Sequence, residues 1–284
     1  MFDASRAGAA LRAIRERRPL IHAITNTVVQ NFTANGLLAL GASPVMADAP
    51  EEAGEVAGKA DALLINLGTL SDRTLRAMEE ALRAANAAGV PAVLDPVGVG
   101  ATAFRTEAVE RLLSAGRFAV IRGNVAEVAN LIGRPLPIKG VDAEAVPTAV
   151  AVAVARAAAE RFETVVAATG PEDFVTDGRR TLIVANGDPL MARVTGSGCL
   201  LGAVVAAFAA VEQEAFRAAA DALVAFGVAG EIARERLAAL GPVRSGRYGI
   251  ALLDALDGLD EGALAARARV REAEEMAAEG GGSA

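Results

Sequence analysis

The sequence predicts an α/β protein of three layers, in which helices flank a mostly parallel central β-sheet. Short apolar runs of strand length alternate with longer segments of helical periodicity, the pattern of repeated β-α-β units. Apolar residues make up 53% of the chain and are mostly Ala, Val and Leu, which suit buried parallel strands under closely packed helices. No linker or composition shift divides the 284 residues. We therefore expect a single domain over residues 1–279, followed by a disordered tail at 280–284.

The first half of the chain is expected to alternate strands and helices, and several helix boundaries carry capping residues. Asn26 is expected to cap the helix after the first strand, and Ser71 the helix after the third. Gly41 and Gly89 are expected to end helices. The expected strands are 20–24, 43–46, 62–65, 92–94 and 118–121, and the expected helices are 5–17, 27–40, 51–59, 72–88 and 105–115.

The second half continues this alternation and then becomes helical. A helix is expected after Asn124, an irregular connection at 133–140 and a strand at 164–168. Segments 173–176 and 182–184 flank the turn sequence DGRR and are expected to form a hairpin at the sheet edge. The remaining helices are expected at 147–161, 199–210, 213–237, about 247–257 and 262–278.

The composition excludes several classes of partner. The net charge of −7 argues against nucleic acid and against an anionic membrane surface, because both require a basic face. The single cysteine excludes an internal disulfide and fits a reducing compartment. The N-terminus lacks the apolar core of a signal peptide, and no apolar run approaches the roughly 20 residues of a membrane helix. We expect a cytoplasmic protein that binds neither nucleic acid nor membrane.

The most informative run is VTGSGCLLG at 194–202. Gly196, Ser197 and Gly198 precede Cys199, and an apolar run begins at Leu200. This pattern predicts a glycine-rich turn that opens a buried helix. The free backbone N–H groups and the helix dipole at such a turn favour an anion, and the small residues suit a phosphate.

Five further motifs follow predicted strands, where ligands of open α/β sheets bind. They are TNT, INLGT, DPVGVGA, RGNVAEV and ATGPED. Asp95, in the third of them, can hold Mg²⁺ through water, although an Asp-Pro pair is also a common turn opener and that interpretation is favoured for the motif alone. Asn124 and Glu127 form a capping pair or, with Glu127 as a second acidic group, complete a magnesium and phosphate site.

Other residues of these motifs have an ordinary alternative beside the functional one. Arg122 can lie over phosphates or at the surface, and Thr169 offers its hydroxyl to nucleotide phosphates in a motif of low specificity. Met46 suits the wall of a small pocket but is more commonly core filler. His22 is the only histidine and is interpreted as structural, which leaves no histidine-based triad. A lone Cys199 is more often a buried hydrophobe than a nucleophile, and only its place at the turn favours a functional role.

Taken together, these motifs closely resemble the hydroxyethylthiazole kinase family. The runs that carry the resemblance, over roughly residues 18–210, are ITNTVVQNFTANGLLALGASPVM, INLGTL, LDPVGVGAT, RGNVAEV and NGDPLMARVTGSGC. The resemblance implies a ribokinase-like fold and phosphorylation of the hydroxyl of 4-methyl-5-(2-hydroxyethyl)thiazole in thiamine biosynthesis or salvage. ATP is the implied co-substrate and Mg²⁺ the implied cofactor. The resemblance also implies a homotrimer with active sites at the subunit interfaces.

The resemblance also assigns roles to individual residues. Arg122 and Thr169 would contact ATP, and Asp95 and Glu127 would lie around Mg²⁺. Residues expected near the thiazole are Met46, Gly196, Asn26, Gly68 and Thr69, and those expected at the reaction centre are Cys199, Gly196 and Gly198. Cys199 stands where related sugar kinases carry an Asp base. We hypothesise that it orients the hydroxyethyl group and assists proton removal only modestly, although the helix N-terminus is expected to lower its pKa.

Departures from the family pattern and two rival functions stay open. Ser197 stands where family members often have Thr. Asp188 commonly corresponds to His in relatives, and the segment at 241–249 differs from the expected GPGSF-like run. The rival enzyme is a kinase of another small alcohol, such as hydroxymethylpyrimidine or a sugar, although such kinases usually present Asp in place of Cys199. The other rival is a non-catalytic protein that binds thiazole or nucleotide on the same scaffold.

Overall fold

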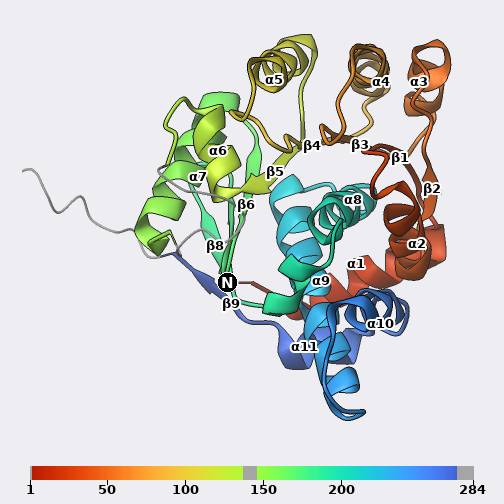
Figure 1. Ribbon diagram of the computed structural model, residues 1–284, viewed down its shortest axis with the longest axis vertical. Coiled ribbons are helices and arrows are strands. Elements are labelled where there is room, and N and C mark those ends of the chain that lie inside the picture. The colour runs from red at the N-terminus through yellow and green to blue at the C-terminus, as the bar shows by residue number, and fades with distance from the viewer. Residues whose placement is uncertain (1, 137–145, 274–284) are drawn as a thin grey trace, which may run out of the picture.

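The computed structural model describes residues 2–136 and 146–273. In this part of the chain, one sheet of nine strands lies between two helical layers (Figure 1). The strands are β1 (Leu20–Ile24), β2 (Ser43–Val45), β3 (Ala62–Asn66), β4 (Ala92–Asp95), β5 (Val120–Asn124), β6 (Val165–Thr169), β7 (Asp173–Thr176), β8 (Thr181–Val184) and β9 (Val270–Glu272). Their order is β2-β1-β3-β4-β5-β6-β7-β8-β9. Strands β1 to β6 are parallel to one another, and β7, β8 and β9 pair antiparallel to their neighbours.

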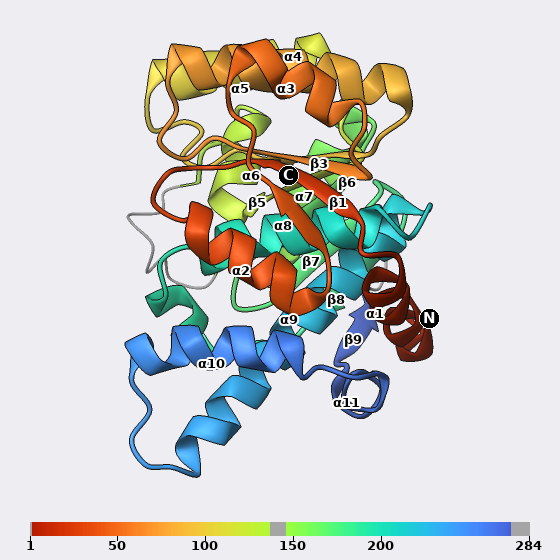
Figure 2. The same ribbon diagram turned by 90° about the vertical axis from the view of Figure 1, so that its right-hand side faces the viewer.

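Helices cover both faces of the sheet, and Figure 2 shows the layers edge on. One face packs against α3 (Pro50–Ala57), α4 (Asp72–Ala88), α5 (Ala103–Ala115), α6 (Val125–Leu131) and α7 (Thr148–Phe162). The other face packs against α1 (Ala4–Arg17), α2 (Gln30–Leu40), α8 (Ser197–Ala209), α9 (Ala215–Ala238), α10 (Ser245–Asp257) and α11 (Glu261–Arg267). A short 3₁₀ helix, η1 (Pro189–Arg193), precedes α8. In β3, Leu63 and Ile65 face the first layer while Leu64 faces the second, as the strand period requires.

Helix α8 is the element that positions the glycine-rich turn. All its residues from Leu200 to Ala209 are buried, because small and aliphatic side chains let the helix pack directly on the sheet. A methyl group placed on Gly202 would lie 3.3 Å from both Asp95 and Leu64. Asp95 ends β4, so α8 begins at the carboxyl edge of the parallel strands and runs toward their amino edge.

The fold class is confirmed, and most element boundaries agree with the sequence to within a few residues. The capping role of Ser71 is also confirmed, because its side chain and that of Thr74 form a capping box. The capping role of Asn26 is wrong. Residues 27–29 form a turn in which the Val29 amide donates to the Asn26 carbonyl, so α2 begins only at Gln30.

The end of the chain also differs from expectation. The helix expected at 262–278 ends at Arg267, and residues 270–272 form β9 instead. Here the Arg269 amide donates to the side chain of Asn186, and the chain then pairs with β8. The expected hairpin, β7 and β8, therefore does not provide the edge of the sheet. Residues 137–140 of the expected irregular connection, 274–278 of the expected helix and the 280–284 tail lie outside the described residues. Within the described ranges, no helix has the length and apolar character needed to span a membrane.

Candidate active site

The turn before α8 leaves three of the backbone amides of residues 196–199 without a hydrogen-bond acceptor among the described residues. Gly196 has φ +90°, and a side chain there would also meet Val29 at 2.6 Å, so only glycine fits. The Ser197 hydroxyl donates to the Met191 carbonyl at 2.7 Å and its amide donates to the Val194 carbonyl. No hydrogen bond from the amides of Gly198 or Cys199 occurs among the described residues, and no side chain there caps the helix. Of the expected amides 196–199, only that of Ser197 has an acceptor, so within the described part of the chain the amides of Gly196, Gly198 and Cys199 are available to an anion.

Arg122 of β5 lies directly beside this helix start. A methyl group on Gly198 would lie 3.3 Å from both Nη atoms of Arg122, so the absence of a side chain there permits close approach of the guanidinium. Arg122 donates to the Thr169 hydroxyl at 3.0 Å and lies 3.6 Å from the Asp95 carboxylate. Only 9% of Arg122 is exposed, so it is not a surface arginine.

Asp95 is completely buried at the carboxyl end of β4. Its Oδ2 accepts a hydrogen bond from Asn66 at 2.7 Å, whereas its Oδ1 has no hydrogen-bond partner among the described residues. Burial raises the pKa of Asp95 to about 7, with Arg122 acting in the opposite direction. A buried carboxylate with one free oxygen can accept a ligand that carries positive charge or a proton.

Cys199 lies next to Asn26, whose amide donates to the thiol sulfur at 3.3 Å. Burial and the charge of Asp95 raise the pKa of the Cys199 thiol, while the Asn66 and Asn26 amides act in the opposite direction. The expectation that the helix N-terminus lowers this pKa is therefore wrong, because desolvation dominates. The thiol is protonated at neutral pH and suits orientation of a hydroxyl better than proton abstraction.

The remaining residues expected near the thiazole come from three neighbouring segments. A methyl group on Gly68 would collide with Asn26 at 2.6 Å, and the Thr69 hydroxyl accepts from the Thr27 amide at 3.1 Å. The structure thus brings Gly68, Thr69 and Asn26 together with Cys199. Met46 directly follows β2 and is half-buried against the core on the α8 side, without a recorded contact to these four residues.

Glu127 forms the capping pair that its spacing predicts. Its Oε2 accepts from the Asn124 amide, and the Asn124 side chain accepts from the Glu127 amide, at 2.9 and 2.8 Å. Glu127 Oε1 also accepts from the Gly98 amide at 2.9 Å, which ties it to the loop after Asp95. The described residues contain no cluster of three acidic, His or Cys side chains able to cage a metal. A site for Mg²⁺ here would have to use water and phosphate oxygens as most of its ligands.

His22 lies in β1 without solvent exposure, as a structural residue. Its Nε2 lies 2.8 Å from the Ala47 carbonyl oxygen, so it carries the proton, while Nδ1 is buried with no partner in the described chain. Burial lowers the pKa of His22. The neutral imidazole therefore anchors the segment that contains Met46.

Asn66 is a buried residue of the INLGT motif to which the sequence analysis assigned no role. It ends β3, pairs in register with Asp95, and bonds to both Asn26 and Asp95 through its side chain. The available signal was an amide that ends an otherwise wholly apolar strand, one strand away from Asp95.

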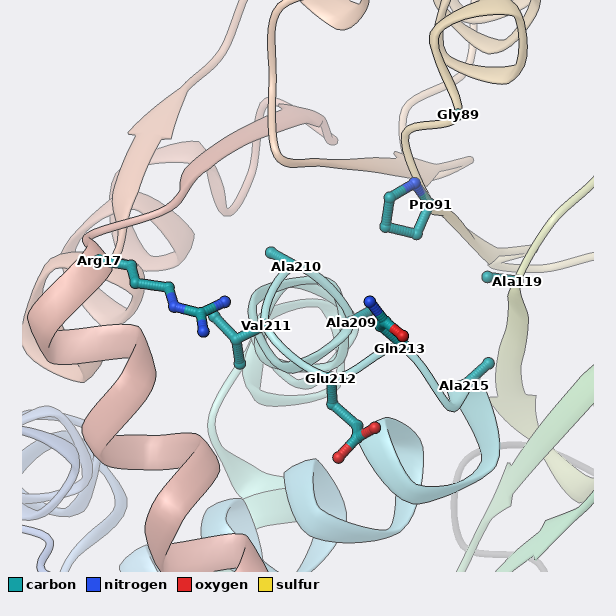
Figure 3. A pocket seen from close by; sticks show the side chains of 10 residues that line it. All are labelled: Arg17, Gly89, Pro91, Ala119, Ala209, Ala210, Val211, Glu212, Gln213 and Ala215. Carbon is teal, nitrogen blue, oxygen red and sulfur yellow. The ribbon is translucent and has the colours of Figure 1, made fainter.

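A pocket of about 590 Å³ lies elsewhere and contains none of these residues. Figure 3 shows it between the end of α8, the start of α9 and the chain before β4 and β5, with the side chains of Arg17, Glu212 and Gln213 around it. It is therefore at the amino edge of the sheet. Ligands of parallel α/β sheets bind at the opposite edge, where the polar residues described above meet.

The comparisons with known proteins agree with this geometry. The model of the hydroxyethylthiazole kinase family matches residues 11–262. A solved hydroxyethylthiazole kinase from Pyrococcus horikoshii OT3 is 46% identical with a TM-score of 0.85, and the match covers 95% of this chain and 99% of that one.

More distant structures share the fold. A ribokinase-like superfamily protein from Enterococcus faecalis V583 is 13% identical with a TM-score of 0.57, over 85% of this chain and 87% of that one. The pyridoxal kinase of Bacillus subtilis, solved as an ADP complex, is 15% identical with a TM-score of 0.53, and the match covers 74% of this chain and 91% of that one.

The sheet and its two helical layers define the ribokinase-like fold class. Within that class, the chain belongs to the hydroxyethylthiazole kinase family. Membership confirms the expected activity, phosphorylation of the thiazole alcohol in thiamine biosynthesis, with ATP as the phosphoryl donor.

Proposed function

We propose that the amides of Gly198 and Cys199 receive the migrating γ-phosphoryl group of ATP while its acceptor, the hydroxyl of 4-methyl-5-(2-hydroxyethyl)thiazole, lies beside Cys199. The observation that carries this proposal is the start of α8, where the amides of Gly198 and Cys199 have no acceptor among the described residues and Gly198 lies next to the buried guanidinium of Arg122. Phosphoryl transfer has a loose transition state, so positioning and charge stabilisation supply most of the rate.

The nucleotide side of the site comprises Arg122 and Thr169. The Thr169 hydroxyl receives a hydrogen bond from Arg122 and itself donates toward the Gly123 carbonyl at 3.3 Å, which orients the guanidinium at the strand ends. The fork of donors on an arginine matches the oxygens of a phosphate. Arg122 accordingly binds ATP phosphates and neutralises charge that develops during transfer.

The alcohol side of the site comprises Asn26, Gly68, Thr69, Met46 and Gly196. Gly68 and Gly196 leave room where any side chain would collide with Asn26 or Val29. The Cys199 thiol and the Asn26 amide are adjacent polar groups that can hold the acceptor hydroxyl. Since the raised pKa keeps the thiol protonated, Cys199 orients this hydroxyl and contributes little as a base.

Asp95 and Glu127 are the residues that would hold Mg²⁺. The Oδ1 of Asp95, which has no partner within the described part of the chain, fits a metal-bound water. Glu127 keeps lone pairs beyond those used by the two amides that it accepts from. When bound, Mg²⁺ supplies charge neutralisation at the phosphate oxygens. Glu127 also holds the loop at Gly98 in place, so its capping role and a role toward the metal are compatible.

We further propose a single-domain subunit, a homotrimer and a cytoplasmic location. Three apolar side chains support an interface: Val28, Leu38 and Ile250 are 66%, 54% and 65% exposed. Leu38 and Ile250 belong to α2 and α10, which pack against each other on one side of the molecule (Figure 2). Exposed apolar residues grouped in this way favour burial against another subunit. Light scattering of the purified protein at several concentrations distinguishes a trimer from a monomer.

The decisive experiment is incubation with the thiazole alcohol, ATP and Mg²⁺ and detection of the phosphomonoester by mass spectrometry. Hydroxymethylpyrimidine and a set of sugars serve as competing acceptors. We expect phosphorylation of the thiazole alcohol at least 100-fold faster than of the others at equal concentration, about 2.7 kcal/mol of discrimination. Equal or faster transfer to another alcohol would overturn the assigned substrate. Tight calorimetric binding of the thiazole without transfer would favour a non-catalytic role.

A further inference from the structure

The side chain of Asn66 connects two groups that face different parts of the site. Its Oδ1 accepts from the Asn26 amide and from the backbone amide of Gly68, both at 3.0 Å. Its Nδ2 donates to Asp95 Oδ2 at 2.7 Å. Because a backbone N–H can only donate, the Gly68 contact fixes which end of the Asn66 amide is oxygen. The NH₂ group must then face Asp95.

Stability alone does not account for an amide at this position. Asn66 is completely buried, and Ala62, Leu63, Leu64 and Ile65 precede it in the same strand. A buried amide costs free energy unless it is fully hydrogen-bonded, and replacement of such an amide together with its partners by apolar groups of the same shape is often close to neutral. The polar residue is therefore best explained by the two side chains that it orients.

These two side chains act on different reactants in the proposed function. Asn26 is adjacent to the Cys199 thiol on the alcohol side, and Asp95 is adjacent to Arg122 on the phosphate side. Among the described residues, the bond from Asn66 is the one hydrogen bond that the Asp95 carboxylate receives, because Arg122 lies farther away, at 3.6 Å. Without Asn66, both side chains lose the partner that fixes their direction.

We propose that Asn66 is a positioning residue that holds Asn26 and Asp95 in a fixed mutual register, so that the acceptor hydroxyl and the transferred phosphoryl group meet in line. This inference rests on the proposed function of the same site. An amide suits this task because it offers an acceptor at one end and a donor at the other. Small errors in such alignment reduce phosphoryl transfer strongly.

Double-mutant cycles test the proposal. Asn66→Ala is measured alone, with Asn26→Ala and with Asp95→Asn, by steady-state kinetics and by calorimetry of the thiazole alcohol and of ATP. We expect Asn66→Ala alone to lower kcat about 10- to 100-fold and to weaken alcohol binding about 3- to 10-fold. In the Asn26→Ala background, Asn66→Ala should change alcohol binding by less than about twofold. In the Asp95→Asn background, Asn66→Ala should change ATP binding by less than about twofold.

The control is Asn186→Ala, because Asn186 is another buried amide with bonds to Glu231, Arg267 and Arg269, far along the sheet near β9. It should change the melting temperature without changing the KM of either substrate. Asn66→Ser leaves a smaller change in volume and replaces Asn66→Ala if that variant does not fold.

Independent, multiplicative effects in both cycles, or a rate loss that follows the folded fraction alone, would overturn the positioning role while the wild-type protein still makes product. A wild-type protein that binds no thiazole alcohol and makes no phosphomonoester would instead overturn the proposed function and this inference with it.

Discussion

The guanidinium of Arg122 lies 3.6 Å from the carboxylate of Asp95, in a place where only 9% of Arg122 and none of Asp95 is exposed. Removal of one partner leaves the other charge buried, so the two depend on each other. Arg122 also has an unpartnered Nε atom among the described residues, and Asp95 an unpartnered Oδ1. These two atoms of the Arg122–Asp95 pair can form hydrogen bonds to a ligand bound at the start of α8.

Arg122→Lys should therefore impair nucleotide use selectively. Lysine keeps the positive charge near Asp95 but cannot also reach Thr169 with a second planar donor, so kcat/KM for ATP should fall about 10- to 100-fold. Steady-state kinetics at saturating alcohol give this value. Arg156→Lys is the matched control, since Arg156 donates to the Thr181 hydroxyl at 2.8 Å outside the site. Unchanged ATP kinetics in Arg122→Lys would remove Arg122 from the nucleotide site.

The turn before α8 should tolerate change far less than the thiol that follows it. Gly196→Ala places a residue with a side chain in a left-handed backbone conformation, and its Cβ would collide with Val29. We expect a loss of activity of at least about 100-fold. Cys199→Ser keeps a hydrogen-bonding group beside Asn26, and we expect a loss of less than about tenfold in kcat. Rapid-quench measurement of phosphoester formation separates the two. A Cys199→Ser enzyme with no detectable turnover would refute a purely orienting role.

The sequence predicted the fold well because local signals dominate in an α/β chain. Strand β3 is apolar up to its last residue, Asn66. The side chain of Ser71 caps the start of α4, and Gly89 ends that helix with a positive φ. Strand ends gather at one edge, so the motifs also predicted which residues of the site would meet. Long-range pairing is harder to infer: β9 exists because Arg269 and its neighbours bond to Asn186 and to β8, which no local pattern reveals.

The details of the site depended on contacts between distant segments. Asn26 had the composition of a helix cap, but its side chain bonds to Asn66 and Cys199, 40 and 173 residues away. The pKa of Cys199 was expected to fall on account of the helix dipole, whereas burial by surrounding elements raises it. In both cases tertiary contacts outweighed the local signal. Asn66 was not singled out although it lies in the INLGT motif, because its bonds to Asn26 and Asp95 join segments that are distant in the sequence.

His22 should make the protein sensitive to acid. Burial lowers its pKa in the folded protein below the 6.5 of the unfolded chain, so the unfolded state binds the proton first. Its contribution to stability is complete above pH 6.5 and is lost as the pH falls toward the folded pKa. His22→Gln can still donate to the Ala47 carbonyl and does not titrate.

The measurement for His22 is urea unfolding of both proteins between pH 5 and 8 at one protein concentration. The free energy of unfolding of the wild type should fall relative to His22→Gln below about pH 6.5, by up to about 1.4 kcal/mol per pH unit. Above pH 7 the difference between the two should be constant. A difference that stays constant down to pH 5 would contradict a buried neutral imidazole.

Asp221 of α9 should have the opposite pH dependence. It is only 3% exposed, and burial together with Glu212 raises its pKa to about 7, against the influence of Arg6 and Arg217. A raised carboxyl pKa means that the folded state binds the proton more tightly than the unfolded state. The stabilisation is therefore complete below about pH 4 and is lost as the pH rises to 7.

Asp221→Asn replaces this carboxyl with a neutral side chain of almost the same shape. Relative to the wild type, its free energy of unfolding should increase between pH 5 and pH 8, by on the order of 2 kcal/mol. Asp254→Asn is the control, the same substitution at an exposed carboxylate. A pH-independent difference for Asp221→Asn would mean that the carboxylate is already ionised at pH 5, stabilised by Arg6 and Arg217 more than burial destabilises it.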